Sequence, residues 1–104
     1  MKIAFQNYFI DVFSIYWVGG KTFFLGLPAG HGGLISYDSS QVKVVDATLA
    51  GRLVFCELNQ IKGVYHWSMI EEQLLDDLLE SDEDAYRRFL DIIKEEGLVD
   101  AGFC

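Results

Sequence analysis

The sequence predicts a single α+β domain over residues 1–104, with an antiparallel sheet of about four or five strands in residues 1–66 and two helices in residues 67–97. Short apolar runs rich in β-branched and aromatic residues fill the first two-thirds of the chain, whereas the last third spaces its apolar residues at helical intervals. A chain of this length has room for one core, and its 51% of hydrophobic residues can fill it. We therefore expect both helices to pack on one face of the sheet.

The strands are predicted from runs of apolar residues between turn signals. Gly19-Gly20 separates FSIYWV from KTFFLGL, and paired glycines supply the positive φ of a tight turn, so a β-hairpin is expected there. GLISYD is expected to be a short strand, and QVKVVDA alternates as a strand with one solvated face does. GRLVFCEL is more continuously apolar, which predicts a central strand.

Residues 4–14 fit two structures. Their apolar residues recur at intervals of three and four, as on one face of a helix, but most of these residues are aromatic or β-branched and prefer strands. They are Phe5, Tyr8, Phe9, Val12 and Phe13. We favour a strand and keep a helix as the alternative.

Helix ends are predicted from capping residues. Ser68 followed by Glu71 has the spacing of a capping box, in which a hydroxyl and a carboxylate bind free N–H groups of the first turn. Ser81 followed by Asp84 offers a second helix start, and Gly97 suits the left-handed position after a helix end. Two ion pairs at i, i+4 spacing are expected in the second helix: Glu83 with Arg87, and Asp84 with Arg88.

Charge is unevenly distributed along the chain, whose net charge is −8. Residues 1–66 contain five bases and four acids, a net of +1, whereas residues 67–104 contain three bases and twelve acids, a net of −9. An acidic segment of this kind repels nucleic acid and anionic membranes and attracts basic partners. We therefore expect a protein partner, with no direct binding to nucleic acid or to a membrane.

Eight carboxylates lie between Glu71 and Asp84 with no Lys or Arg among them. On one continuous helix, Glu72, Asp76 and Glu80 would form a row of like charges that repel one another. A face of one sign predicts a cationic partner, whereas an ordinary solvated face is the alternative interpretation. The predicted partner-binding residues are Glu72, Asp76, Asp77, Glu80, Asp82 and Glu83.

Other reactive residues do not form a recognisable site. DDLLESDEDAY lacks the glycine and the alternating oxygen ligands of a calcium loop, and GLPAGHGG around His31 lacks the Gly-Lys-Ser/Thr of a phosphate loop. His66 is expected to pack near a helix start, and Cys56 and Cys104 are expected to be free thiols. We expect no enzyme activity, no metal and no cofactor. A small enzyme that uses His31 or His66 is the alternative.

Compartment and assembly are predicted from features that the sequence lacks. No secretory signal pattern and no stretch of about 20 apolar residues is visible, so a cytoplasmic protein is expected. Abundant aromatic residues are compatible with a monomer or a weak homodimer.

The chain is short, acidic and rich in aromatic residues, has no catalytic motif, and closes with HWSMIEEQLLDDLLESDEDAYRRFLDIIKEEG. In these features it resembles the immunity proteins of bacterial polymorphic-toxin and contact-dependent growth inhibition systems. The resemblance implies a cytoplasmic protein without activity of its own that binds one cognate toxin domain, often a nuclease, and blocks its active site. Two alternatives are a phage-type inhibitor that mimics nucleic acid, such as an anti-restriction or anti-CRISPR protein, and an adaptor domain whose acids only keep it soluble.

Overall fold

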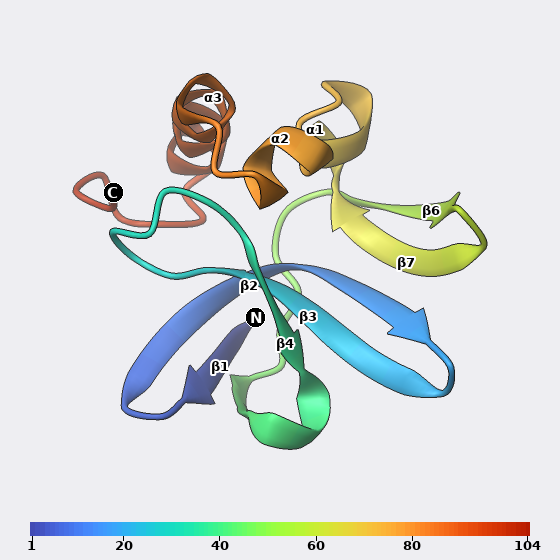
Figure 1. Ribbon diagram of the computed structural model, residues 1–104. Helices are drawn as coiled ribbons and strands as arrows, with labels where there is room; N and C mark the ends of the chain where they lie inside the picture. The colour runs from blue at the N-terminus through green and yellow to red at the C-terminus, as the bar shows by residue number, and fades with distance from the viewer.

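The computed structural model describes residues 1–104 and confirms the α+β class (Figure 1). The strands are β1 (Lys2–Phe5), β2 (Tyr8–Val18), β3 (Lys21–Leu27), β4 (Ile35–Asp38), β5 (Lys43–Asp46), β6 (Leu53–Leu58) and β7 (Ile61–His66). The helices are α1 (Trp67–Glu71), α2 (Leu75–Leu79) and α3 (Glu83–Glu95), with a 3₁₀ turn, η1, at Ser39–Gln41. The chain thus has seven strands where about four or five are predicted, and three helices where two are predicted.

Strand β2 organises the sheet because it pairs with three other strands, all antiparallel. β3 pairs along one edge of β2, while β1 and β7 divide the other edge between its first and second halves. β4 then pairs with β3, β5 with β1, and β6 with β7. The three helices lie together on one face of this sheet, as predicted (Figure 1).

The N-terminal residues form two strands rather than a helix, which confirms the favoured prediction for residues 4–14. The turn between β1 and β2 has Gln6 at a φ of 55°, and the register places Phe5 opposite Tyr8. The hairpin at Gly19-Gly20 is also confirmed, since both glycines have positive φ and Val18 pairs with Lys21. In the first hairpin, the strand preference of aromatic and β-branched residues therefore outweighs the helical spacing.

Strand β6 is an edge strand, which corrects the prediction that it is central. It pairs only with β7. Cys56 and Leu58 pack on the main core, but Phe55 points to the opposite face and is 66% exposed. The continuous apolar run therefore reflects one buried face and one open face. Strand β5 differs from its prediction too, because all four of its residues are exposed.

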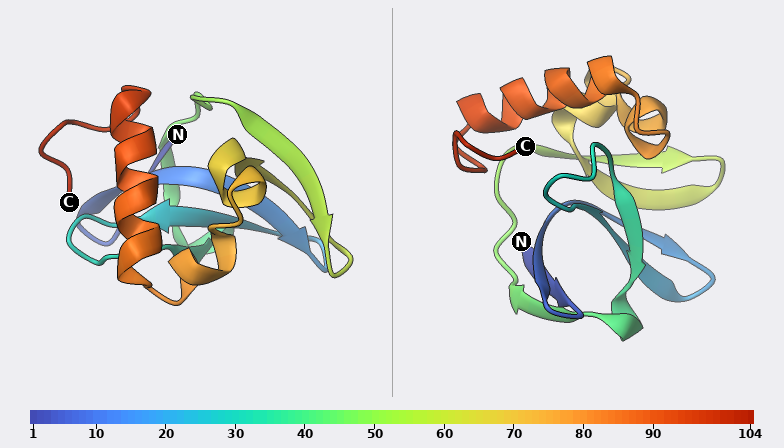
Figure 2. Two further views of the ribbon diagram at one scale, coloured as in Figure 1. Left: turned by 90° about the horizontal axis from the view of Figure 1, so that it is seen from above. Right: turned by 60° about the vertical axis from the view of Figure 1, so that its left-hand side comes forward.

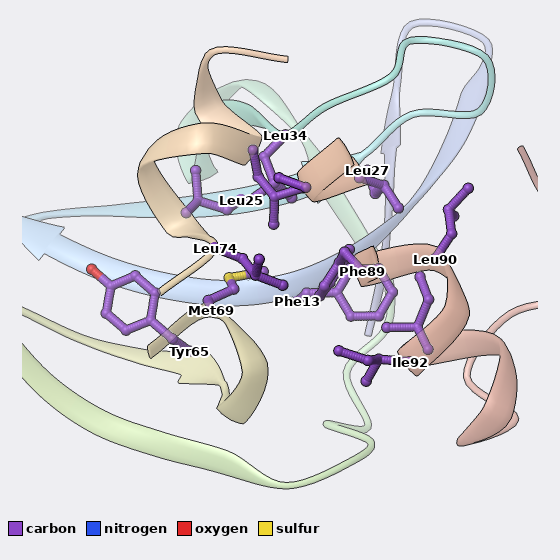
Figure 3. Packing of buried hydrophobic residues seen from close by; sticks show 13 residues of the cluster. Phe13, Leu25, Leu27, Leu34, Tyr65, Met69, Leu74, Phe89, Leu90 and Ile92 are labelled. Atoms are coloured by element: carbon purple, nitrogen blue, oxygen red, sulfur yellow. The ribbon is translucent and has the colours of Figure 1, made fainter. Parts of the chain in front are cut away.

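The main core lies between the sheet and the helices (Figure 3). Phe13 occupies an irregularity in the pairing of β2 with β3, where Val12 pairs with Gly26 and Ser14 with Leu25. The Phe13 ring packs edge-on against Phe89 of α3, with ring centroids 5.3 Å apart. The irregularity thus directs one more large side chain of β2 into the helix-facing core.

A second, smaller core lies on the other side of β2. It contains Ile3, Ile10, Val12, Phe24 and Tyr37. In the right-hand view of Figure 2, strands from the first half of the chain curl around this region below the helices. Because β2 contributes residues to both cores, it connects the two packed layers.

The predicted first helix is interrupted. α1 ends at Glu71, Gln73 takes a φ of 56°, and the chain restarts as α2 at Leu75. Ser81, at a φ of 58°, separates α2 from α3. The longest helix, α3, has 13 residues, and none of the three has the length and apolarity needed to cross a membrane.

Candidate protein-binding site

The six predicted partner-binding residues do not form one row, because the chain bends between Glu72 and α2. The left-handed conformation of Gln73 separates Glu72 from Asp76 and Glu80, so the predicted row of like charges on a single helix is wrong. The local reason is visible in the backbone hydrogen bonds. The N–H of Leu74 binds the carbonyl of Met69 and the N–H of Gln73 binds that of Ile70, a pattern that ends α1.

Three of the six residues are engaged within the molecule. Glu72 accepts two hydrogen bonds from Arg88, from Nε at 2.8 Å and from Nη2 at 2.7 Å, and these bonds hold the pKa of Glu72 below its ordinary range. Glu83 pairs with Arg87, as predicted. The predicted pairing of Asp84 with Arg88 is replaced by the Glu72–Arg88 pair, which joins the end of α1 to α3.

Asp82, the third engaged residue, is the N-cap of α3. Its Oδ1 accepts a hydrogen bond from the N–H of Ala85 at 2.9 Å. The predicted helix start at Ser81 is therefore displaced by one residue, since Ser81 is the left-handed residue that ends α2. A carboxylate in this position stabilises the first turn of a helix and is committed to the fold.

Asp76, Asp77 and Glu80 remain, and we call them the α2 carboxylates. All three are exposed, and none of them takes part in an ion pair of the molecule. Asp76 and Asp77 occupy the first turn of α2, and Glu80 follows its last residue. They are the part of the predicted site whose charge is not used internally.

Two hollows lie beside the α2 carboxylates and share Leu58, Leu75 and Asp76. The first, of about 360 Å³, is also lined by Met69 and Ile70 of α1 and by Asp77. The second, of about 290 Å³, lies between α2 and the turn from β6 to β7, and its lining includes Tyr16, Ile61, Tyr65 and Leu79. We call the pair the α2 hollows.

Sequence reasoning missed Leu75 and Leu79, although a signal for them exists. Leucines stand in adjacent pairs, Leu74-Leu75 and Leu78-Leu79, and an amphipathic helix can turn only one of each pair fully inward. Leu74 and Leu78 are buried, whereas Leu75 is half-buried and Leu79 is 45% exposed. The second leucine of each pair therefore borders the α2 hollows.

His66 is the centre of a second polar cluster, which is buried. The N–H of Ser68 donates to its Nδ1 at 3.3 Å, so His66, and not Ser68, is the N-cap of α1. The predicted capping box is wrong, and Glu71 pairs instead with Arg52 at 2.7 Å. Because Nδ1 accepts, the ring proton lies on Nε2, which donates to Glu96 at 2.6 Å.

The Ser68 hydroxyl also lies 2.8 Å from His66 Nδ1. The order hydroxyl, imidazole, carboxylate occurs in nucleophilic active sites, but both Ser68 and His66 have no exposed surface. The Trp67 indole N–H donates to the second oxygen of Glu96 at 2.7 Å. Burial acts to raise the pKa of Glu96, but the hydrogen bonds from Trp67 and His66 outweigh it and lower the pKa. This network joins β7, α1 and the end of α3.

The glycine-rich segment around His31 supports α2. A Cβ atom at Gly33 would lie 2.6 Å from the Leu78 carbonyl oxygen, so only glycine fits there, and the N–H of Leu34 donates to that carbonyl at 3.0 Å. His31 itself is exposed. Cys56 and Cys104 are free, as predicted, and no group of three or more His, Cys, Asp or Glu side chains is arranged to hold a metal ion.

Comparisons with known proteins found no protein family, no curated protein and no solved structure that matches this chain.

Proposed function

We propose that this chain is a cytoplasmic, non-catalytic immunity protein that binds and neutralises a basic, nuclease-like toxin domain through the α2 carboxylates. The observation that carries the proposal is the exposure of Asp76, Asp77 and Glu80 without an internal cation. Elsewhere in the acidic segment, Arg52, Arg87 and Arg88 each pair with a carboxylate. α2 is thus where three of these free carboxylates cluster, whereas Asp84 in the first turn of α3 is a single further exposed acid without an ion pair.

The chemistry of a nuclease supports this choice of partner. A nuclease must present a basic cleft, because it binds the phosphates of its substrate. Carboxylates held on a folded helix can lie over such a cleft, accelerate the encounter by electrostatic attraction and discriminate against partners of the wrong charge. Fast association is what protection from a toxin requires, and the net charge of −8 favours it at long range.

The pattern of internal pairing favours this function over mimicry of nucleic acid. A mimic of a phosphate backbone needs a long series of unpaired charges, whereas Glu71, Glu72 and Glu83 are neutralised by arginines. Two carboxylates on a helix of five residues and a third directly after it form a short patch, which suits a single local contact with a protein.

The proposal predicts that a toxin domain is encoded beside this chain in its native genome, and neutralisation of that domain is the test. We expect the triple variant Asp76→Lys, Asp77→Lys, Glu80→Lys to slow association about tenfold at low salt and to weaken protection of cells that express the toxin domain. Stopped-flow association rates at several salt concentrations, and growth of co-expressing cells, measure the two effects.

A matched control reverses three other exposed acids, Asp91, Glu95 and Asp100, and so changes the net charge by the same amount. We expect this control to slow association much less, because none of its three residues belongs to α2 or lines the α2 hollows. If the two triple variants bind and protect equally well, general charge rather than the α2 surface governs binding, and the proposal is wrong.

A further inference from the structure

The helix layer leaves part of the main core uncovered between α2 and the turn from β6 to β7. Tyr16, Leu58 and Leu75 pack on the core, but each is only half-buried, and all three line the second of the α2 hollows. Leu79, at its edge, is 45% exposed. An apolar floor that the fold does not cover offers burial to a side chain from another molecule.

The rim of this apolar floor is acidic. Asp76 lines both hollows and Asp77 lines one, and no Lys or Arg lines either. Glu80 directly follows Leu79. Any group that enters the hollows therefore meets an apolar surface and unpaired negative charge together.

Charge decides which occupant suits this site. A second copy of the chain would bring its own net charge of −8 and the same acidic rim, so like charges would meet. A segment with an apolar side chain next to lysine or arginine satisfies both parts of the surface. Charge complementarity thus favours a basic protein segment over self-association at this face.

We infer that the α2 hollows hold a large apolar side chain of the partner, of the size of Leu, Ile, Phe or Trp, flanked by Lys or Arg. This inference rests on the proposed function and adds the chemistry of the recognised segment. The carboxylates attract the partner and set the association rate, while the buried apolar side chain slows its dissociation. Binding by charge alone would leave the hollows empty.

The experiment uses random twelve-residue peptides displayed on phage and selected on the full chain. We expect the enriched peptides to carry a large apolar residue with Lys or Arg within two positions. Synthetic copies of these peptides, measured by fluorescence anisotropy, should bind Leu79→Asn at least about fivefold more weakly than the parent chain. The control Leu49→Asn changes a leucine that is 46% exposed and outside the hollows, and should bind as the parent does. Thermal melting of both variants checks that they are folded.

Three outcomes overturn the inference: no enrichment of such peptides, enrichment of basic peptides without an apolar residue, or equal binding to Leu79→Asn and to the parent. Neutralisation of the toxin domain distinguishes an error in the apolar anchor from an error in the proposed function. If Leu79→Asn protects cells fully while reversal of the α2 carboxylates abolishes protection, the function stands and the apolar anchor is wrong. If reversal of the carboxylates leaves protection intact, the proposed function itself fails.

Discussion

Glu96 shows how one side chain can join three elements. One carboxylate oxygen accepts a hydrogen bond from His66 at the end of β7, and the other accepts one from Trp67 at the start of α1. Glu96 itself follows the last residue of α3. Because His66 is also the N-cap of α1, loss of the Glu96 charge affects both the position of α3 and the orientation of the imidazole.

We predict that Glu96→Gln lowers the free energy of unfolding at neutral pH, and that this loss shrinks on acidification. The pKa of Glu96 in the folded chain is below its ordinary value of 4.5, so the unfolded chain binds the proton more readily. The stabilisation by the Glu96 charge is therefore complete above that ordinary value and is lost as the pH falls through the folded-state pKa. Urea unfolding of both proteins at about pH 7 and about pH 3 measures the difference.

Glu95→Gln is the control, since it removes a carboxylate from the adjacent, exposed position of the same helix. It should change the free energy of unfolding by less than about 0.5 kcal/mol at either pH. A loss in Glu96→Gln that is as large in acid as at neutral pH would mean that shape, rather than charge, accounts for its effect.

At the scale of the element, all three helices end in the same way. The residue after each C-cap is left-handed: Gln73 after α1, Ser81 after α2 and Gly97 after α3, with φ values of 56°, 58° and 73°. In each case the next residue donates its N–H to a carbonyl five positions back, at Met69, Asp77 and Ile93 respectively. Glycine stands at only one of the three left-handed positions.

These left-handed helix ends predict that glycine is more stabilising than alanine at one position of the chain and less stabilising at another. At Gln73, the glycine variant should be more stable than the alanine variant by about 1 kcal/mol, because a Cβ atom is unfavourable at positive φ. At Asp91, inside α3, the order should invert by a similar amount, since glycine there loses more conformational entropy. Thermal or urea unfolding of the four variants measures both differences. The same order at both positions would contradict the left-handed conformation of Gln73.

The hairpin at Gly19-Gly20 and the end of α3 at Gly97 were predictable from the sequence, because glycine adopts positive φ at little cost. The breaks at Gln73 and Ser81 were not, since neither residue favours positive φ by itself. They form where buried Leu74 and Leu78 hold short helices against the sheet. The positive φ of Gln73 and Ser81 therefore results from tertiary packing, which a local sequence pattern does not encode.

The residues of the candidate site were predictable from the sequence. Which of their carboxylates lack an internal ion pair was not. The sequence identifies all six acidic residues, yet Glu72 is paired with Arg88, which lies 16 positions along the chain. That pair depends on how α1 and α3 approach each other. The edge position of β6 likewise depends on which strands pair, because an apolar run suits both a central strand and a strand that is covered on one face only.

At the scale of the whole molecule, the uneven charge along the sequence becomes an uneven charge between layers. Residues 1–66, with a net charge of +1, form the seven strands, while residues 67–104, with −9, form the helix layer. The helices cover one face of the sheet, so the negative field is strongest outside that face (Figure 2). This field would guide the basic partner that we propose to the helix side, where the α2 carboxylates lie.

The two cores should unfold together as one domain, because β2 supplies Ile10 and Val12 to the smaller core and Phe13 to the main core. Ile3 belongs to the smaller core and has no exposed surface, so we predict that Ile3→Ala lowers the free energy of unfolding by about 2–5 kcal/mol. The helices contribute no residue to the cluster that contains Ile3. They should nevertheless be destabilised by the same free energy, because a single domain unfolds cooperatively.

Urea unfolding tests this prediction, with far-ultraviolet circular dichroism reporting the helices and fluorescence reporting Trp17 on β2 and Trp67 on α1. We expect the two signals to change at the same urea concentration, in the parent and in Ile3→Ala alike. The control Val45→Ala, at a residue that is 45% exposed, should shift stability by less than about 0.5 kcal/mol. If Ile3→Ala left the helical transition at the parental urea concentration, the smaller core would be an independent unit. The helix layer would then not depend on the curled strands beneath it, and the α2 surface would need only β2, β3, β6 and β7 for support.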